Sequence, residues 1–331
     1  MRLGRIIATL TAVALVGGYV ALDAADAVPG PLTTRPLISE PAARPAVEVE
    51  PAPADPAAFA VVPVPAGDTS GLLAEFVASP EVGPRVAVDL LDASTGQRIA
   101  SHNPTQLGPP ASSTKVLTAA AALTRLGPMA TFPTTAVLAD STLVLVGGGD
   151  LLLGTGEPSE GPDGHASLTV LASQVAASLQ SRGISSVALG VDDTLFEGRG
   201  AEVWDPLDYR WVIEMTPLAV HGGMSGEEFV SNLDYTAHTA GLFAAELAAQ
   251  GIAVEGEPAR MRAPEGAELV GMVESATVEE VTGWMMKSSN NSVSEALARH
   301  VAIARGEGST AAAGASAVTA EIAALGLPST G

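Results

Sequence analysis

The 331-residue chain has no cysteine, only two lysines and few aromatic residues. The lack of cysteine excludes disulfides, thiolate-ligated zinc and a thiol nucleophile. Aromatic residues make up 4% of the chain and hydrophobic residues 47%, so we expect a core built mainly of alanine, valine and leucine. The formal net charge of −21 disfavours nucleic-acid binding, because that affinity comes largely from cationic side chains that neutralise phosphates.

The two lysines both lie in short serine-containing motifs, whereas arginine supplies the other positive charges. Lys115 closes the S-x-x-K sequence that begins at Ser112, and Lys287 precedes the S-x-N sequence of Ser289 and Asn291. A side chain that is nearly absent elsewhere but present at both motifs is expected to serve chemistry. S-x-x-K followed by S-x-N is typical of serine enzymes that form acyl intermediates with D-alanyl peptides or β-lactams.

Ser112 and Lys115 are expected on one face at the start of a helix over 112–126, where their side chains can meet. A serine hydroxyl needs a base to become nucleophilic, and lysine is a base only when burial or a nearby cation lowers its pKa. The alternative is structural: Ser112 caps the helix, Lys115 is solvated, and the polar run at 288–292 is a second cap or turn. The two motifs together are more specific than either alone.

The chain is predicted to begin with an exported leader and a tether. Arg2 and Arg5 precede an apolar run, which predicts a signal peptide or N-terminal anchor at 1–27, with the cleaved signal favoured. Recurrent proline and alanine predict an extended linker at 28–70.

The remaining chain is predicted to mix strands and helices. We expect a hairpin formed by strands at 85–92 and 97–102, further strands at 136–138, 143–146 and 186–192, and helices at 168–182, 236–250, 278–304 and 311–325.

Longer matches to the two motifs carry a family resemblance. The segments Pro110-Ala111-Ser112-Ser113-Thr114-Lys115 and Lys287-Ser288-Ser289-Asn290-Asn291 resemble the Pro-Ala-Ser-x-x-Lys and Lys-x-Ser-x-Asn segments of low-molecular-mass penicillin-binding proteins of the D-alanyl-D-alanine carboxypeptidase/endopeptidase type. Two supporting similarities are Gly147-Gly148-Gly149-Asp150 and the segment 191–196 followed by Trp204. The long interval between the motifs distinguishes the chain from class A β-lactamases.

The resemblance implies an α+β, penicillin-binding/β-lactamase-like serine acyltransferase fold. Residues 71–131 and 221–331 would form an incomplete transpeptidase-like catalytic domain, and 132–220 an inserted strand-rich subdomain. The family's Lys-Thr-Gly motif is absent, and the nearest string is Ser329-Thr330-Gly331. We therefore expect a C-terminally truncated chain that lacks sheet strands, with the hairpin at 85–102 left without its sheet partners.

The resemblance also implies a reaction on peptidoglycan stem peptides outside the cell. Ser112 would be the acylated nucleophile and Lys115 its base, Ser289 would assist proton transfer, Asn291 would bind substrate, and Lys287 would support the site. D-Ala-D-Ala carboxypeptidase and endopeptidase activity, covalent inhibition by β-lactams and the lack of any cofactor follow as expectations. Two alternatives stay open: a β-lactamase-like hydrolase with fast deacylation, and a non-catalytic cell-wall-binding relative.

Overall fold

The computed structural model describes residues 69–83, 85–93, 95–200, 211–225, 228–229 and 233–327. The chain divides into two compact units, Met1–Gly108 and Pro109–Gly331. The predicted leader at 1–27 and all but the end of the predicted linker lie outside the described residues. In the part that is described, no helix is both long enough and apolar enough to span a membrane.

The described part of the first unit is a helix, α2 (Thr69–Ala78), and a hairpin of β1 (Val88–Leu91) and β2 (Arg98–His102). The two strands pair antiparallel, and the Arg98 guanidinium bonds the Asp89 carboxylate at 2.5 and 2.7 Å. Among the described strands, β1 and β2 pair only with each other. Leu91 and Ile99 on these strands remain about half exposed.

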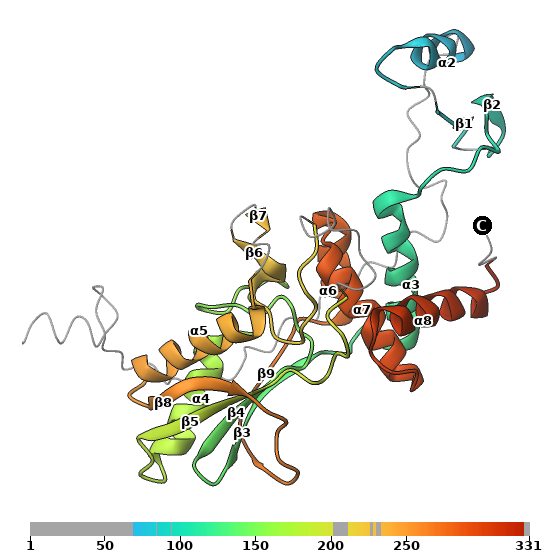
Figure 1. Ribbon diagram of the computed structural model, residues 1–331. Coiled ribbons are helices and arrows are strands. Elements are labelled where there is room, and N and C mark those ends of the chain that lie inside the picture. The colour runs from blue at the N-terminus through green and yellow to red at the C-terminus, as the bar shows by residue number, and fades with distance from the viewer. Residues whose placement is uncertain are drawn as a thin grey trace, which may run out of the picture. The chain divides into compact units, whose positions relative to one another are not determined.

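The second unit contains a five-stranded mixed sheet in the order β8-β5-β4-β3-β9, with α4 and α5 packed against it (Figure 1). β4, β5 and β8 run parallel, whereas β3 pairs antiparallel with both β4 and β9. The core between sheet and helices is mainly leucine, valine and alanine. The elements are β3 (Pro133–Ala139), β4 (Thr142–Val146), α4 (Leu168–Gln180), β5 (Ser186–Asp192), α5 (Tyr235–Ala249), β8 (Ala253–Arg260) and β9 (Glu268–Glu274).

The sheet does not end where the inserted subdomain was predicted to end. Its two edge strands, β8 and β9, both follow residue 220, so the predicted boundary there cuts through the sheet. The cause is long-range pairing: β9 aligns with β3, for example Thr134 opposite Val273. Two smaller elements, η5 (His221–Gly223) and the ribbon of β6 (Met224–Ser225) and β7 (Glu228–Phe229), lie between β5 and α5 in the chain.

Four helices pack together beside the sheet and form a second core. They are α3 (Lys115–Arg125), α6 (Val278–Ser288), α7 (Asn291–Arg305) and α8 (Ala311–Ala324), and we call them the helical layer (Figure 1). With the sheet they confirm the predicted α+β class.

The helical layer contains a fully buried arginine. Arg299 on α7 donates to the carbonyl oxygens of Glu197, Gly198 and Ser309 at 2.8–3.1 Å, and to the Glu295 carboxylate at 2.7 and 3.1 Å. Its guanidinium thereby ties α7 to the segment that follows β5.

Side-chain caps explain where most of these helices begin. Each cap accepts a hydrogen bond from a backbone N–H in the first turn, which would otherwise lack a partner. The capping residues are Ser167 for α4, Asp234 for α5, Thr277 for α6, Asn290 for α7 and Thr310 for α8.

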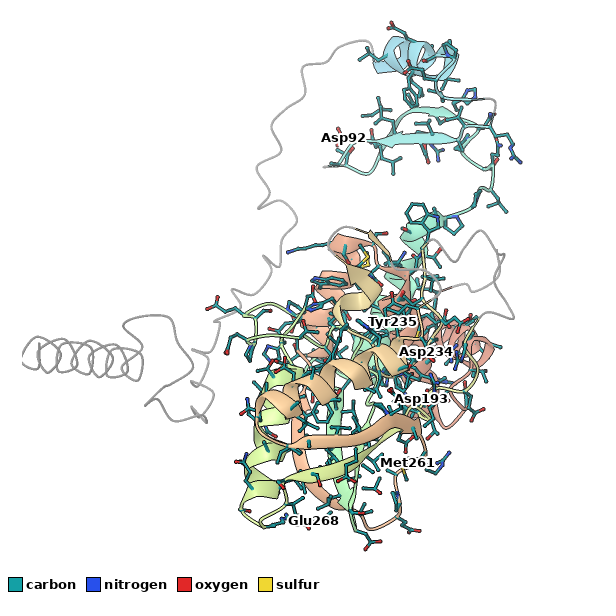
Figure 2. The ribbon with its side chains drawn as sticks, turned by 60° about the vertical axis from the view of Figure 1, so that its left-hand side comes forward. Asp92, Asp193, Asp234, Tyr235, Met261 and Glu268 are labelled. Atoms are coloured by element: carbon teal, nitrogen blue, oxygen red, sulfur yellow. The ribbon has the colours of Figure 1, made fainter. Side chains whose placement is uncertain are left out.

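An arginine at the end of β8 joins the sheet to the start of α5. Arg260 bonds the Asp193 carboxylate at 2.7 Å and the Asp234 carboxylate at 2.6 Å. Figure 2 shows these two aspartates close to each other at one end of α5. Hydrogen bonding to Asp234, and then to Asp193, raises the pKa of Arg260, so this link stays charged at every physiological pH.

Candidate active site

Ser112 lies in a short 3₁₀ turn, η2 (Ala111–Thr114), that runs directly into α3. The neighbouring Ser113 hydroxyl donates to the Pro110 carbonyl and ties the turn to the proline before it. The predicted helix therefore opens as a tighter turn than expected. Because side chains three residues apart eclipse each other in a 3₁₀ turn, Ser112 faces Lys115.

Lys115 is the buried centre of the site. Its side chain is 7% exposed, and Nζ lies 3.1 Å from Ser112 Oγ and 2.5 Å from Asn291 Oδ1. Burial lowers the pKa of the Lys115 ammonium, because removal from water disfavours the charged form. The amine is thus within hydrogen-bond reach of the serine hydroxyl and is shifted toward the neutral form that a base requires.

The single helix predicted over 278–304 is wrong: the chain forms two helices with a break between them. α6 ends at Ser288 and α7 begins at Asn291. Ser289 at the break has the left-handed conformation, with φ 56° and ψ 28°. Its hydroxyl donates to Ser112 Oγ at 2.8 Å, so the break is what brings the second motif onto the first.

Asn290, the middle residue of the S-x-N motif, fixes this break, and its role was not predicted. The side chain is buried, its Oδ1 accepts from the Val293 N–H at 2.9 Å, and its Nδ2 donates to the Gly222 carbonyl at 3.1 Å. An asparagine before a helix is a recognisable capping signal. The contact with Gly222 had no local signal, because it joins positions 68 residues apart.

The structure brings four of the five predicted site residues together. Ser112, Lys115, Ser289 and Asn291 form one hydrogen-bonded cluster. Lys287 is exposed in the last turn of α6 and bonds no described residue, so it does not join this cluster.

The Gly147–Asp150 stretch packs tightly beneath the site's helices. A Cβ on Gly148 would lie 1.6 Å from the Pro133 carbonyl oxygen, and one on Gly149 would lie 2.3 Å from His300 Nε2 on α7. Asp150 is buried and accepts the Leu152 N–H at 2.9 Å, and burial raises its pKa to about 7. These glycines are required by packing.

Of the other segments that carried the family resemblance, the structure describes residues 191–196. Asp192 caps the turn after β5, where its carboxylate accepts from the Thr194 hydroxyl at 2.7 Å and from its N–H at 3.0 Å. Trp204 and Ser329-Thr330-Gly331 lie outside the described residues.

Sequence comparison decides the family. The model of the D-Ala-D-Ala carboxypeptidase 3 (S13) family matches residues 70–231 and 218–331, which include both motifs. The chain belongs to this family. The predicted kinship with low-molecular-mass penicillin-binding proteins of the D-Ala-D-Ala carboxypeptidase type is thereby confirmed.

Individual S13 relatives are similar over different shares of their length. Carboxypeptidase DacB of Mycolicibacterium smegmatis is 32% identical, over 99% of this chain and 69% of the relative. Carboxypeptidase Rv3627c of Mycobacterium tuberculosis is 29% identical, over 74% of this chain and 54% of the relative. The chain thus spans between about half and two thirds of the length of these relatives.

A solved structure supports the S13 fold independently. Penicillin binding protein 4 (dacB) from Haemophilus influenzae superposes with a TM-score of 0.54 at 19% identity, over 71% of this chain and 66% of that one. At this identity the likeness concerns the fold alone. It agrees with the predicted penicillin-binding type of α+β architecture.

An open groove leads away from the hydrogen-bonded cluster. It has a volume of about 700 Å³ and runs between α3, α7 and α8 from Lys115 and Asn291 to Ala315 and Thr319. Ser112 is exposed, whereas Lys115 behind it is buried. An exposed hydroxyl backed by a desolvated amine is the arrangement needed for nucleophilic attack on a carbonyl.

Proposed function

We propose that this chain carries the acylation site of a serine-type D-Ala-D-Ala carboxypeptidase/endopeptidase that acts on peptidoglycan stem peptides. The observation that carries the proposal is the contact set of Lys115, whose buried Nζ lies 3.1 Å from Ser112 Oγ and 2.5 Å from Asn291 Oδ1. Membership in the S13 family supports the substrate class.

In the proposed reaction, the neutral Lys115 amine accepts the proton of Ser112 as Oγ attacks the carbonyl carbon of the D-Ala-D-Ala bond. The C–N bond breaks, and D-alanine leaves after its nitrogen receives the proton that Lys115 took up, relayed through the Ser289 hydroxyl, which lies 2.8 Å from Ser112 Oγ. Water then attacks the ester and releases the shortened stem peptide. When the leaving amine belongs to a second stem peptide, the same steps constitute endopeptidase cleavage.

Asn291 is proposed to have two tasks. Its Oδ1 accepts from Lys115 Nζ and so positions the base. Its Nδ2 group donates to none of the described residues, which leaves it for a carbonyl of the substrate. Lys287 is proposed only as an outer electrostatic support, because it is exposed.

The proposed site of action is outside the cytoplasmic membrane, where peptidoglycan is located. The predicted leader at 1–27, as a signal peptide or membrane tether, supports export. β-Lactams are proposed as covalent inhibitors, because their strained amide presents a carbonyl carbon to the same serine.

Intact-mass measurement after exposure to penicillin tests the proposal. We expect a stable adduct of one penicillin on the wild-type chain and none on Ser112→Ala. Fast turnover of penicillin without an adduct would indicate a β-lactamase-like hydrolase. Absence of both, with peptidoglycan binding that Ser112→Ala leaves unchanged, would indicate a non-catalytic wall-binding protein and overturn the proposal.

A further inference from the structure

Three successive residues in η5 have left-handed backbone conformations. The φ angles are 52° at His221, 64° at Gly222 and 79° at Gly223. Glycine adopts such angles without strain, but histidine does so only when its surroundings hold it there. Backbone hydrogen bonds hold this turn, from Gly222 N–H to the Leu151 carbonyl at 2.6 Å, from His221 N–H to the Leu153 carbonyl at 3.1 Å and from Gly223 N–H to the Val220 carbonyl at 3.0 Å.

The turn contacts the S-x-N motif at its middle residue. The Gly222 carbonyl accepts from Asn290 Nδ2 at 3.1 Å. The approach is so close that a Cβ on Gly222 would lie 2.9 Å from that nitrogen and 3.3 Å from the Trp284 ring. Asn290 lies between Ser289 and Asn291, so any displacement of its side chain moves two groups of the active site.

The His221 side chain ties the same turn to the loop before α4. Its Nδ1 lies 2.9 Å from the Asp163 carboxylate, and its Nε2 lies 3.3 Å from the Thr155 hydroxyl. Hydrogen bonding to Asp163 raises the pKa of the half-buried His221 imidazole. The other titratable groups of the 150–167 loop are Asp150, Glu157, Glu160 and His165, and the pKa of Asp150 is raised by burial and then by the charge of Asp163.

The three side chains nearest to a Cβ on Gly222 are uncharged. They are Asn290, Trp284 and Leu152. From α5, the Tyr235 hydroxyl donates to the neighbouring Gly223 carbonyl at 2.8 Å. Among these groups Asp163 is the charged one that bonds the His221 ring, and the backbone of the turn links that ring to Asn290.

We propose that the His221–Asp163 pair is a positioning element of the active site, which holds the Gly222 carbonyl against Asn290 and so sets Ser289 and Asn291 relative to Ser112. The inference rests on the proposed acylation at Ser112. Neither His221 nor Asp163 touches the reacting atoms. Their effect is exerted through the Gly222–Asn290 bond.

The pair acts most strongly in acid. A histidine whose folded pKa is raised stabilises its contacts below the unfolded pKa, near 6.5, and this contribution is lost as the pH rises through the folded value. The turn is therefore held by a charged pair near pH 6, and this contribution falls as the pH rises through the folded pKa of His221.

Acylation by a fluorescent penicillin, followed at pH 6 and pH 8, tests the pair. We expect Asp163→Asn, which keeps a hydrogen-bond acceptor but removes the charge, to lower the acylation rate constant about tenfold at pH 6 and less at pH 8, well short of the hundredfold that a misplacement of 1 Å can cost. Asp163→Ala should lower it at both pH values. A purely structural role would reduce stability but leave the rate constant of the folded protein and its pH profile unchanged.

A pair of glycine variants tests the contact itself. Gly222→Ala introduces both a left-handed alanine and a clash with Asn290, whereas Gly266→Ala introduces a left-handed alanine at φ 77° with nothing within 4 Å of its Cβ. We expect Gly222→Ala to slow acylation at least tenfold and Gly266→Ala to leave it unchanged, since a displaced Asn290 moves Ser289 and Asn291. Equal rates in the two folded variants would overturn the proposal.

An NMR titration separates this inference from the proposed function. The side-chain amide signals of Asn290 should shift with the midpoint of the His221 imidazole, and Asp163→Asn should lower that midpoint for both. If wild type forms no adduct but this coupling is present, the proposed function fails and the positioning contact stands. If wild type is acylated but the Asn290 side-chain signals do not shift as His221 titrates, the positioning inference is wrong.

Discussion

The helical layer and the sheet of the second unit bury different kinds of side chain. The sheet core is mainly leucine, valine and alanine, with Leu143 and Leu145 fully buried. In the described part of the chain, the three buried basic side chains, Lys115, Arg299 and His300, all belong to the helical layer. Burying such groups costs free energy unless each finds partners or gives up its charge.

The sheet and the helical layer therefore contribute differently to stability and to the site. The sheet gains free energy from apolar burial and carries none of the four clustered site residues. The helical layer contains polar groups whose desolvation costs free energy. This desolvation serves the site, because burial lowers the pKa of a lysine and lets it act as a base. Substitutions in the two regions should therefore separate activity from stability.

The largest expected effect follows from Lys115→Met, which keeps the length of the side chain and removes the base. We expect penicillin acylation to fall by about 10³-fold, within the range of general-base contributions. The unfolding free energy in urea should be unchanged or higher, because a buried amine is replaced by an apolar group. Retained acylation with an unchanged pH profile would show that another group takes the proton.

Arg299→Ala, in contrast to Lys115→Met, should act mainly on stability. The variant leaves the Glu295 carboxylate and three carbonyl oxygens without their donor, so we expect a loss of about 3–5 kcal/mol in unfolding free energy. Chemical denaturation followed by circular dichroism measures it. A loss below about 1 kcal/mol would mean that water replaces the guanidinium without penalty.

Leu145→Ala probes the sheet alone. Leu145 is fully buried on β4, and removing its side chain leaves a cavity that should cost about 2–5 kcal/mol. The acylation rate constant of the folded variant should equal that of wild type. A slower rate at temperatures where the variant stays folded would contradict the separation of the two regions.

His300 gives the smallest effect at neutral pH, and its contribution to stability depends on pH. Burial lowers its pKa to about 4, whereas the unfolded value is near 6.5. The unfolded chain then binds more protons between these values, so stability falls as the pH drops from 6.5 to 4, by about 3 kcal/mol at the lower limit.

Unfolding measured at pH 7 and pH 4 in wild type and His300→Gln isolates this contribution. The difference between the two proteins should change with pH in the direction given above. If the unfolding free energies of the two proteins changed by the same amount between pH 7 and pH 4, His300 would be protonated in the folded state.

Local signals in the sequence were sufficient for most helices. The helices predicted at 168–182, 236–250 and 311–325 agree with α4, α5 and α8 to about two residues, because each begins at a side-chain cap. β8 and β9 were both missed, and for β8 the reason is physical. The β8 sequence contains glycine, proline and glutamate, which are poor strand formers, and only pairing with β5 makes it a strand.

The sequence predicted the residues of the candidate site but not the contacts that hold them in place. The scarcity of lysine pointed to Lys115, and motif spacing pointed to Ser112, Ser289 and Asn291. The same scarcity also pointed to Lys287, which lies outside the hydrogen-bonded cluster. The Gly222–Asn290 contact depends on tertiary packing and leaves no periodic or motif signal.

The left-handed backbone of Ser289 also restricts which residues natural variation can place there. Threonine would preserve the hydroxyl that faces Ser112, yet a branched Cβ is strongly disfavoured at a φ of 56°. Asparagine and glycine fit the backbone but lack the hydroxyl. Serine alone satisfies both demands, so the genetic tolerance of this position is set by chain conformation as much as by chemistry.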